Sequence, residues 1–308
     1  MTYLSGSTDN LPSRRQFLAA AMVSGLGSSL LAQEEPHVMR VDTHVHCFAG
    51  PEDARFPFHP QAPYEPAEPA TPQHLLRCMD GAGVDRAIIV HPEPYQDDHR
   101  YLKHCLDVGQ GRLKGTVLLF ADDPQMAEKM TRLAQRGDIV AARIHAYAPE
   151  RMPPDDIRLI RALWRQATEL GLAVQLHFEP RHAPRFEPLI REFRETPVII
   201  DHLGRPFQGT PQEHQVVIDW AKYPHTTLKL SAIPAKTSYP HRDIAPVIRR
   251  LCDAYGPGRL IHGGGSGASA TGASYLAAFE RTAQYLAHFN PAEQAQVLGG
   301  NAARLFQL

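Results

Sequence analysis

Two histidines in the segment Val41-Asp42-Thr43-His44-Val45-His46 are the residues best placed to do chemistry in this chain. The β-branched residues around them predict a strand, and side chains two positions apart on a strand point to the same side. Two neutral imidazoles at one strand end form half of a site for a divalent metal such as zinc. We therefore take His44 and His46 as candidate metal ligands.

Histidines and basic residues also lie at or near the ends of most of the other segments that the sequence predicts to be strands. Those segments are 38–46, 87–91, 115–120, 140–145, 173–178, 198–202, 227–231 and 260–262. Random placement would scatter polar residues along the strands, whereas α/β barrels carry their active sites at the C-terminal strand ends. The strand-end residues are His44, His46, His91, Arg143, His145, His177, His202 and Lys229.

Amphipathic segments alternate with these strands and predict the helices between them. They cover residues 72–82, 98–108, 124–136, 155–170, 184–194, 212–222, 243–254 and 273–288, with a last helix over 291–306. Eight strand-then-helix units predict a (β/α)8 TIM barrel, an α/β fold, in a single domain over residues 37–308. A doubly wound open sheet is the alternative, but it usually has a glycine-rich turn after its first strand, and none is present here.

Length, charge and cysteine content narrow the function classes. The chain has 308 residues, of which 43% are hydrophobic, and this is enough for one large core. A formal net charge of -1 gives no electrostatic reason to expect binding to nucleic acid or to an anionic membrane. The four cysteines contain no CxxC pair and do not indicate a disulfide framework.

The first 32 residues predict an export signal. Ser13-Arg14-Arg15-Gln16-Phe17-Leu18 has the pattern of a twin-arginine motif, and an apolar stretch follows over 19–32. This stretch is shorter than the roughly 20 apolar residues that a membrane span requires. We expect a twin-arginine-type signal over residues 1–32, a periplasmic location, and no stable membrane insertion after cleavage. A disordered apolar tail is the alternative.

The loop after the last predicted strand, residues 263–272, is rich in glycine. Such a loop could be a mobile linker. Its backbone N–H groups could instead form a nest that binds an anion, and barrels often bind phosphate at this end. The sequence leaves both interpretations open.

Four motifs follow one another along the chain: Asp42-Thr43-His44-Val45-His46, Gln175-Leu176-His177, Ile200-Asp201-His202-Leu203-Gly204-Arg205-Pro206 and Gly300-Asn301-Ala302-Ala303-Arg304-Leu305-Phe306. Together they resemble the amidohydrolase-2, or amidohydrolase-related, branch of the amidohydrolase superfamily. Within it, Arg55-Phe56-Pro57-Phe58 and the Asp201–Pro206 segment are most similar to the 2-pyrone-4,6-dicarboxylate hydrolase-like lactonases. Other members are aromatic-acid decarboxylases and sugar lactonases.

The resemblance implies a barrel with one divalent metal ion, such as zinc, at its strand ends. His44, His46 and His177 would be the metal ligands, and the catalytic His202 would orient or protonate the substrate. Arg205 matches a position that binds substrate carboxylate.

Two residues of the fourth predicted strand are further candidates for binding the substrate. The guanidinium of Arg143 could pair with a carboxylate through two parallel hydrogen bonds. His145 ends the same strand, and we take it as a second substrate-binding candidate.

The chain departs from the family at its eighth strand. The family pattern Trp-Gly-Ser-Asp-x-Pro reads His262-Gly263-Gly264-Gly265-Ser266-Gly267 here, so Gly265 replaces an aspartate that would bind metal and accept a proton from water. His262 lies three residues earlier and is predicted to face the opposite side. Three histidines and a water would still make a reasonable zinc site, with His202, His145 or the substrate as the base.

Two aspartates flank the candidate ligands. Strand alternation places Asp42 on the face of His44 and His46, where its carboxylate could fix a ring tautomer. The same rule, counted from His202, predicts that Asp201 points away from the site and is structural.

These observations predict a metal-dependent hydrolase that opens a carboxylate-bearing lactone or a related carbonyl compound. Two alternatives stay open: a decarboxylase of an aromatic or unsaturated acid, and a non-catalytic or metal-independent barrel that has lost the strand-eight aspartate. The expected partner is a small anionic substrate, and an oligomer is compatible with the sequence.

Overall fold

A computed structural model describes residues 38–147, 152–233 and 243–308 of the chain. Eight parallel strands form one sheet in the order β1 to β8. The predicted export signal, residues 1–32, lies outside the described residues. The strands are β1 (Val41–Val45), β2 (Arg86–Val90), β3 (Leu113–Leu118), β4 (Ile139–Ala146), β5 (Ala173–Phe178), β6 (Val198–Ile200), β7 (Thr226–Ser231) and β8 (Leu260–Gly263).

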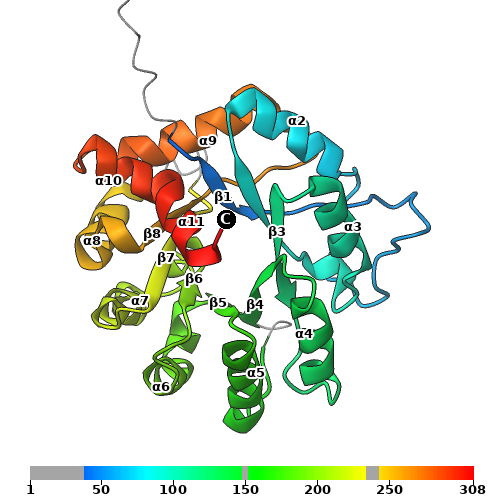
Figure 1. Ribbon diagram of the computed structural model, residues 1–308. Helices are drawn as coiled ribbons and strands as arrows, with labels where there is room; N and C mark the ends of the chain where they lie inside the picture. The colour runs from blue at the N-terminus through cyan, green and yellow to red at the C-terminus, as the bar shows by residue number, and fades with distance from the viewer. Residues whose placement is uncertain (1–37, 148–151, 234–242) are drawn as a thin grey trace, which may run out of the picture. The chain divides into compact units, whose positions relative to one another are not determined.

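The first and last strands meet, so the sheet is a nearly closed barrel. The Thr43 hydroxyl of β1 donates a hydrogen bond of 2.6 Å to the carbonyl oxygen of His262 in β8. Figure 1, a view along the barrel, shows the strands inside a ring of helices. The prediction of a single-domain (β/α)8 barrel is confirmed over residues 38–308.

The helices follow the predicted order, and the first of them matches its predicted bounds. Thr71 caps this helix, α2, through a hydrogen bond from the His74 N–H, and Pro72 opens its first turn. The helices are α2 (Pro72–Ala82), α3 (Arg100–Gly109), α4 (Met126–Ala134), α5 (Ile157–Glu169), α6 (Glu187–Glu192), α7 (Pro211–Asp219), α8 (Ala245–Tyr255), α9 (Gly272–Tyr285), α10 (Pro291–Ala295) and α11 (Asn301–Phe306).

The last predicted helix, 291–306, is divided in the structure. A π-helical turn, Gln296–Gly300, separates α10 from α11. Within this turn, a Cβ atom on Gly299 would lie 1.8 Å from the carbonyl oxygen of Met39. Only glycine allows the turn to approach the chain before β1 so closely.

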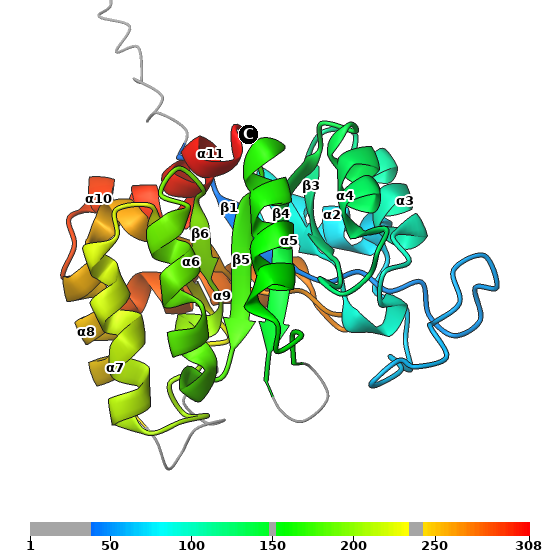
Figure 2. The same cartoon turned by 90° about the horizontal axis from the view of Figure 1, so that it is seen from below.

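Helix α11 closes the end of the barrel opposite the candidate site. Ala302 and Phe306 pack against an inner layer of apolar side chains formed by Val41, Ile88, Ala141, Ala173, Ile199 and Ile261. In Figure 2, α11 and the arrowheads of β4 and β5 lie at opposite ends of the barrel. Polar chemistry is therefore confined to the C-terminal strand ends. No helix within the described ranges is long and apolar enough to cross a membrane.

Candidate active site

Asp201, directly after β6, is buried at the centre of the barrel. Its Oδ2 accepts hydrogen bonds from Arg143 Nε at 2.9 Å and Gln175 Nε2 at 2.8 Å. Its Oδ1 lies 3.0 Å from Lys229 Nζ. Burial alone would raise the pKa of Asp201, but Lys229 and Arg143 lower this pKa to well below its usual range. Asp201 is ionised, and the prediction that it points away from the site is wrong.

The strand register explains this error. Ile199 faces the barrel interior, and Asp201, two residues later, faces the same way. His202 leaves this alternation because its backbone turns to a left-handed φ of 53°. Alternation counted from Ile199, instead of from His202, predicts that the Asp201 side chain faces the barrel interior.

His44 and His46 face each other beside this carboxylate. His44 Nδ1 lies 3.7 Å from Asp201 Oδ1, and His44 Nε2 lies 3.3 Å from His46 Nε2. Burial lowers the pKa of His46 to about 4 and that of His44 to well below its usual value. Both rings are therefore neutral at pH 7. His46 Nδ1 donates to the carbonyl oxygen of Val90 at 2.7 Å, which leaves its Nε2 without a proton.

This pair fits a divalent cation. An unprotonated ring nitrogen is the donor that zinc-like ions bind, and hydrogen bonding at the other ring nitrogen orients the ligand. Among the described residues, His44, Asp201 and His202 offer ligand atoms that all lie within 4.8 Å of one another. His46 and His177 are outside this trio, and their roles as metal ligands stay predictions.

His202 lies in a left-handed turn that returns its ring to the barrel mouth. Its ring centre is 4.5 Å from that of His44 and 4.9 Å from that of His177. Ser231 Oγ is 2.8 Å from His202 Nδ1 and accepts the backbone N–H of His202 at 3.1 Å. Burial lowers the pKa of His202 to about 3, so the ring is neutral. Backbone strain of this kind is common at functional sites.

Arg205 and His145 lie at the edges of this cluster. Arg205 lines a hollow of about 210 Å³ together with His177 and His202. Its guanidinium stacks 4.9 Å above the ring of Tyr147. The Tyr147 hydroxyl donates to Glu93, and His145 Nδ1 lies 2.8 Å from the same carboxylate.

The guanidinium of Arg143 is bound within the protein: both its Nε and its Nη2 contact the Asp201 carboxylate. Its predicted role in binding substrate stays a prediction. His91 has partners outside the cluster: its Nε2 bonds with the carbonyl oxygen of Gln96, and its ring lies 4.3 Å from that of His99.

Asp42 faces the glycine-rich loop instead of the histidine rings. Its Oδ1 accepts the backbone N–H groups of His44 at 2.8 Å and Gly264 at 3.0 Å, and its Oδ2 accepts that of Gly265 at 3.2 Å. Burial raises the pKa of Asp42 to about 6. The predicted tautomer role is wrong, because a register shift between Asp42 and Val45 interrupts strand alternation. The backbone nest therefore exists, and its anion is the chain's own carboxylate.

Gly265 sits in this nest with a φ of 77°. Of the described residues, a Cβ atom there would meet only the carbonyl oxygen of His44, at 3.8 Å. The left-handed backbone therefore restricts this position to glycine more than lack of space does. His262 faces outward as predicted. Its Nδ1 lies 2.9 Å from Thr282 Oγ1, and its ring centre lies 4.0 Å from that of Phe279 in α9.

The pairing of Asp201 with Lys229 predicts a strong energetic coupling. Lys229→Met is expected to destabilise the protein by about 3–5 kcal/mol, because it leaves a buried carboxylate short of positive charge. Adding Asp201→Asn to this variant should cost less than the sum of the two single changes. The measurement is the free energy of unfolding in urea, in a double-mutant cycle.

Arg249→Ala serves as the control, because it breaks an exposed ion pair with Asp253 and should change stability by less than about 0.5 kcal/mol. Additive effects of the two changes at Asp201 and Lys229 would contradict the proposed pairing.

Comparisons with known proteins agree with this geometry. The chain is 29% identical over 232 residues to a 4-sulfomuconolactone hydrolase from Rhizobium radiobacter, covering 72% of this chain and 73% of that one. It is 27% identical over 299 residues to an L-fucono-1,5-lactonase from Burkholderia ambifaria, covering 87% of this chain and 96% of that one.

Solved structures share the fold. A probable 2-pyrone-4,6-dicarboxylic acid hydrolase from Acinetobacter baumannii, with citric acid bound, superimposes with a TM-score of 0.69 at 21% identity, over 87% of this chain and 99% of that one. A zinc-bound amidohydrolase from Burkholderia multivorans has a TM-score of 0.67 at 20% identity, over 88% and 99%. The Amidohydrolase family matches residues 41–308, and the chain belongs to this family of hydrolases.

Proposed function

We propose that this protein is a lactone hydrolase that acts on a substrate bearing a carboxylate or a similar anionic group. The observation that carries this proposal is the gathering of His44, His177, His202 and Arg205 at one barrel mouth. The two lactone-hydrolysing relatives support the reaction class. A neutral imidazole and a cationic guanidinium beside one hollow suit the attack of water on an anionic ester.

His202 is the residue we assign to proton transfer. We assign the ring proton to Nδ1, where it would donate to Ser231 Oγ, so that Nε2 has the free lone pair and exchanges protons. Nε2 takes a proton from the attacking water as the new C–O bond forms. It returns this proton to the ring oxygen when the ester C–O bond breaks, and the products are one alcohol and one carboxylic acid. The neutral ring has the free lone pair that the first step requires, and its pKa of about 3 makes it a weak base.

His44 and His46 are the residues we assign to a divalent metal, and Asp201 has a ligand atom within 4.8 Å of one on His44. We assign His177 as a further ligand because its ring lies at the same barrel mouth, 4.9 Å from that of His202. When bound, the metal would polarise the lactone carbonyl and lower the pKa of a bound water toward about 7. The carbonyl oxygen of Val90 holds the Nδ1 atom of His46, and the Asp201 carboxylate faces the Nδ1 atom of His44, so that the Nε2 atoms of the two rings point toward each other. Zinc is our choice because imidazole ligands suit it.

Arg205 is the anchor we assign to the anionic group. Stacking on Tyr147 fixes the plane of the guanidinium, and a fixed plane favours paired hydrogen bonds to a carboxylate. Arg205 and the proton-transferring His202 line the same hollow. A substrate held by its carboxylate would therefore present a neighbouring carbonyl to His202.

The reaction class is tested by supplying two sets of compounds to the purified protein. We expect acid release from carboxylated five- and six-membered lactones in a pH-stat, and no CO2 from hydroxybenzoic acids. Treatment with 1,10-phenanthroline should abolish hydrolysis, and Zn²⁺ should restore it. CO2 release without acid release would contradict the hydrolase, and full activity in metal-free protein would contradict the role of His44 and His46 as metal ligands.

Replacement of Arg205 tests the anchor. Arg205→Met should raise KM for a carboxylated lactone by about ten- to a hundredfold, which corresponds to the loss of a charged hydrogen bond worth 1.5–3 kcal/mol. The KM for the uncharged parent lactone should not change. Arg181→Met is the matched control, because Arg181 is half-exposed and paired with Glu179. An equal rise in KM for charged and uncharged lactones would count against an anchoring role.

A further inference from the structure

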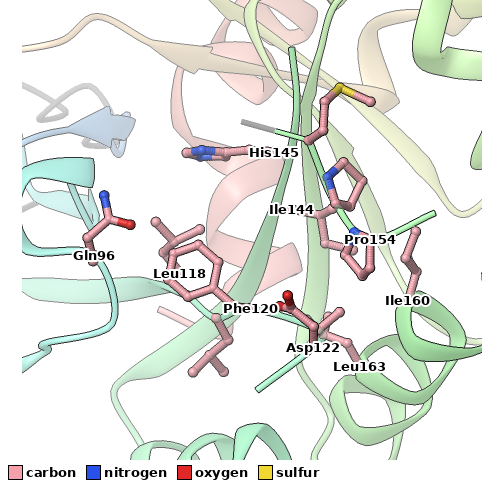
Figure 3. Close-up of a pocket in the computed structure, with 13 residues that line it drawn as sticks. Gln96, Leu118, Phe120, Asp122, Ile144, His145, Pro154, Ile160 and Leu163 are labelled. Carbon is pink, nitrogen blue, oxygen red and sulfur yellow. The ribbon is translucent and has the colours of Figure 1, made fainter. Parts of the chain in front are cut away.

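A second hollow, of about 250 Å³, lies beside the histidine cluster between β3, β4 and α5. Figure 3 shows the side chains that line it, with Leu118 and Phe120 between Gln96 and Pro154. Most of them are apolar, and Asp122 is the one that carries a formal charge. Apolar side chains with a few polar groups typically line ligand sites, and a volume just below the usual range of such sites suits only part of a small ligand.

The rim of this hollow, which we call the apolar hollow, carries exposed apolar side chains. Phe120 is 37% exposed and Met152 is 39% exposed, and both line it. Among the described residues, only Val38, Tyr64 and Leu159 are other large hydrophobic residues with comparable exposure. Apolar groups that gather at a concave rim mark a binding surface more often than isolated ones do.

His145 supplies a polar atom in this apolar wall. Its side chain is more than nine-tenths buried, and its Nε2 has no hydrogen-bond partner within the described part of the chain. Its Nδ1 lies 2.8 Å from Glu93 Oε1. A neutral ring that donates Nδ1–H to this carboxylate keeps Nε2 as an acceptor. A buried acceptor without a partner is costly unless a ligand or water fills it.

His145 also connects the apolar hollow to the candidate active site. Its ring centre is 5.2 Å from that of His177, and the ring of His177 is 4.9 Å from that of His202. His177 and His202 line the hollow that contains Arg205. The three rings therefore form a row from the apolar hollow to the anchoring guanidinium. A ligand that spans the row would have one anionic end and one apolar end.

We propose that the apolar hollow is a second substrate subsite, which takes an uncharged aryl or alkyl arm of the lactone and offers His145 Nε2 to a hydroxyl on that arm. This inference rests on the proposed function for the identity of the occupant. The carboxylate of Asp122 at the rim disfavours a second anionic group there. The subsite therefore predicts a substrate with a single anionic end.

Binding of a small probe tests the subsite without any need for turnover. The probe is 4-ethylphenol, which combines an apolar body with a hydroxyl group, and calorimetric titration measures its affinity. We expect one site per chain in the wild-type protein. Its methyl ether, 4-ethylanisole, should bind about fivefold more weakly, because the lost hydrogen bond is worth about 1 kcal/mol. Absence of binding by 4-ethylphenol would overturn the proposal.

Two tryptophan variants locate the binding. Ala121 lines the apolar hollow and is only partly buried, so Ala121→Trp should fill the hollow and weaken binding at least tenfold. Leu159→Trp adds an indole to the exposed side of α5, outside the lining, and should leave the affinity unchanged. Urea unfolding checks that both variants are folded. Equal affinities in the two variants would contradict the assigned location.

Hydrolysis assays separate this inference from the proposed function. In a protein that hydrolyses carboxylated lactones, adding a propyl arm to the ring should lower KM in the wild-type protein but not in Ala121→Trp. Hydrolysis without any effect of the arm would overturn the subsite alone. The opposite result is also distinguishable. If the protein hydrolyses no lactone but binds 4-ethylphenol, and Ala121→Trp abolishes this binding, the hollow is supported as a binding site and the proposed function is overturned.

Discussion

One buried carboxylate organises the polar centre of this barrel. Asp201 contacts Arg143, Lys229 and Gln175, and it also faces the ring of His44. Two buried cations without this carboxylate would be very costly, and a buried carboxylate without them would be equally so. Asp201, Arg143 and Lys229 together carry one positive charge, and Asp42, which acts on Lys229, offsets it when ionised. The charge that favours an anionic substrate in the mouth above is that of Arg205.

A second carboxylate shapes the edge of the same mouth in a different way. Asp42 accepts three backbone N–H groups, two of them from the glycine-rich loop after β8. This loop is therefore tied to β1, next to His44. The two aspartates have separate tasks: Asp201 sets the charge and the ring orientation inside the barrel, and Asp42 fixes the backbone that surrounds it.

Much of the fold could be predicted from the sequence because barrel elements have regular periods. The pattern of β-branched and polar residues gave β5 its correct bounds, and the caps at Thr71 and Pro72 gave α2 its correct start. The same regularity brought the strand-end histidines to one face of the barrel. The predicted directions of two side chains were wrong where the backbone departs from regular strand alternation. These places are the register shift in β1 and the left-handed turn at His202. As a result, Asp201 faces the ring of His44, where Asp42 was expected, and Asp42 binds backbone N–H groups away from the rings.

The direct test of the account is the protonation pattern of His44 and His46, read from their ring nitrogens by 15N NMR on histidine-labelled protein. We expect neutral rings with the proton on Nδ1 in both residues at pH 7. His46 Nδ1 donates to the carbonyl oxygen of Val90, and the Asp201 carboxylate, 3.7 Å from His44 Nδ1, favours a proton on that nitrogen through its charge. In Asp201→Asn, His44 should lose this tautomer while His46 keeps it. An unchanged His44 signal in that variant would contradict the central role of Asp201.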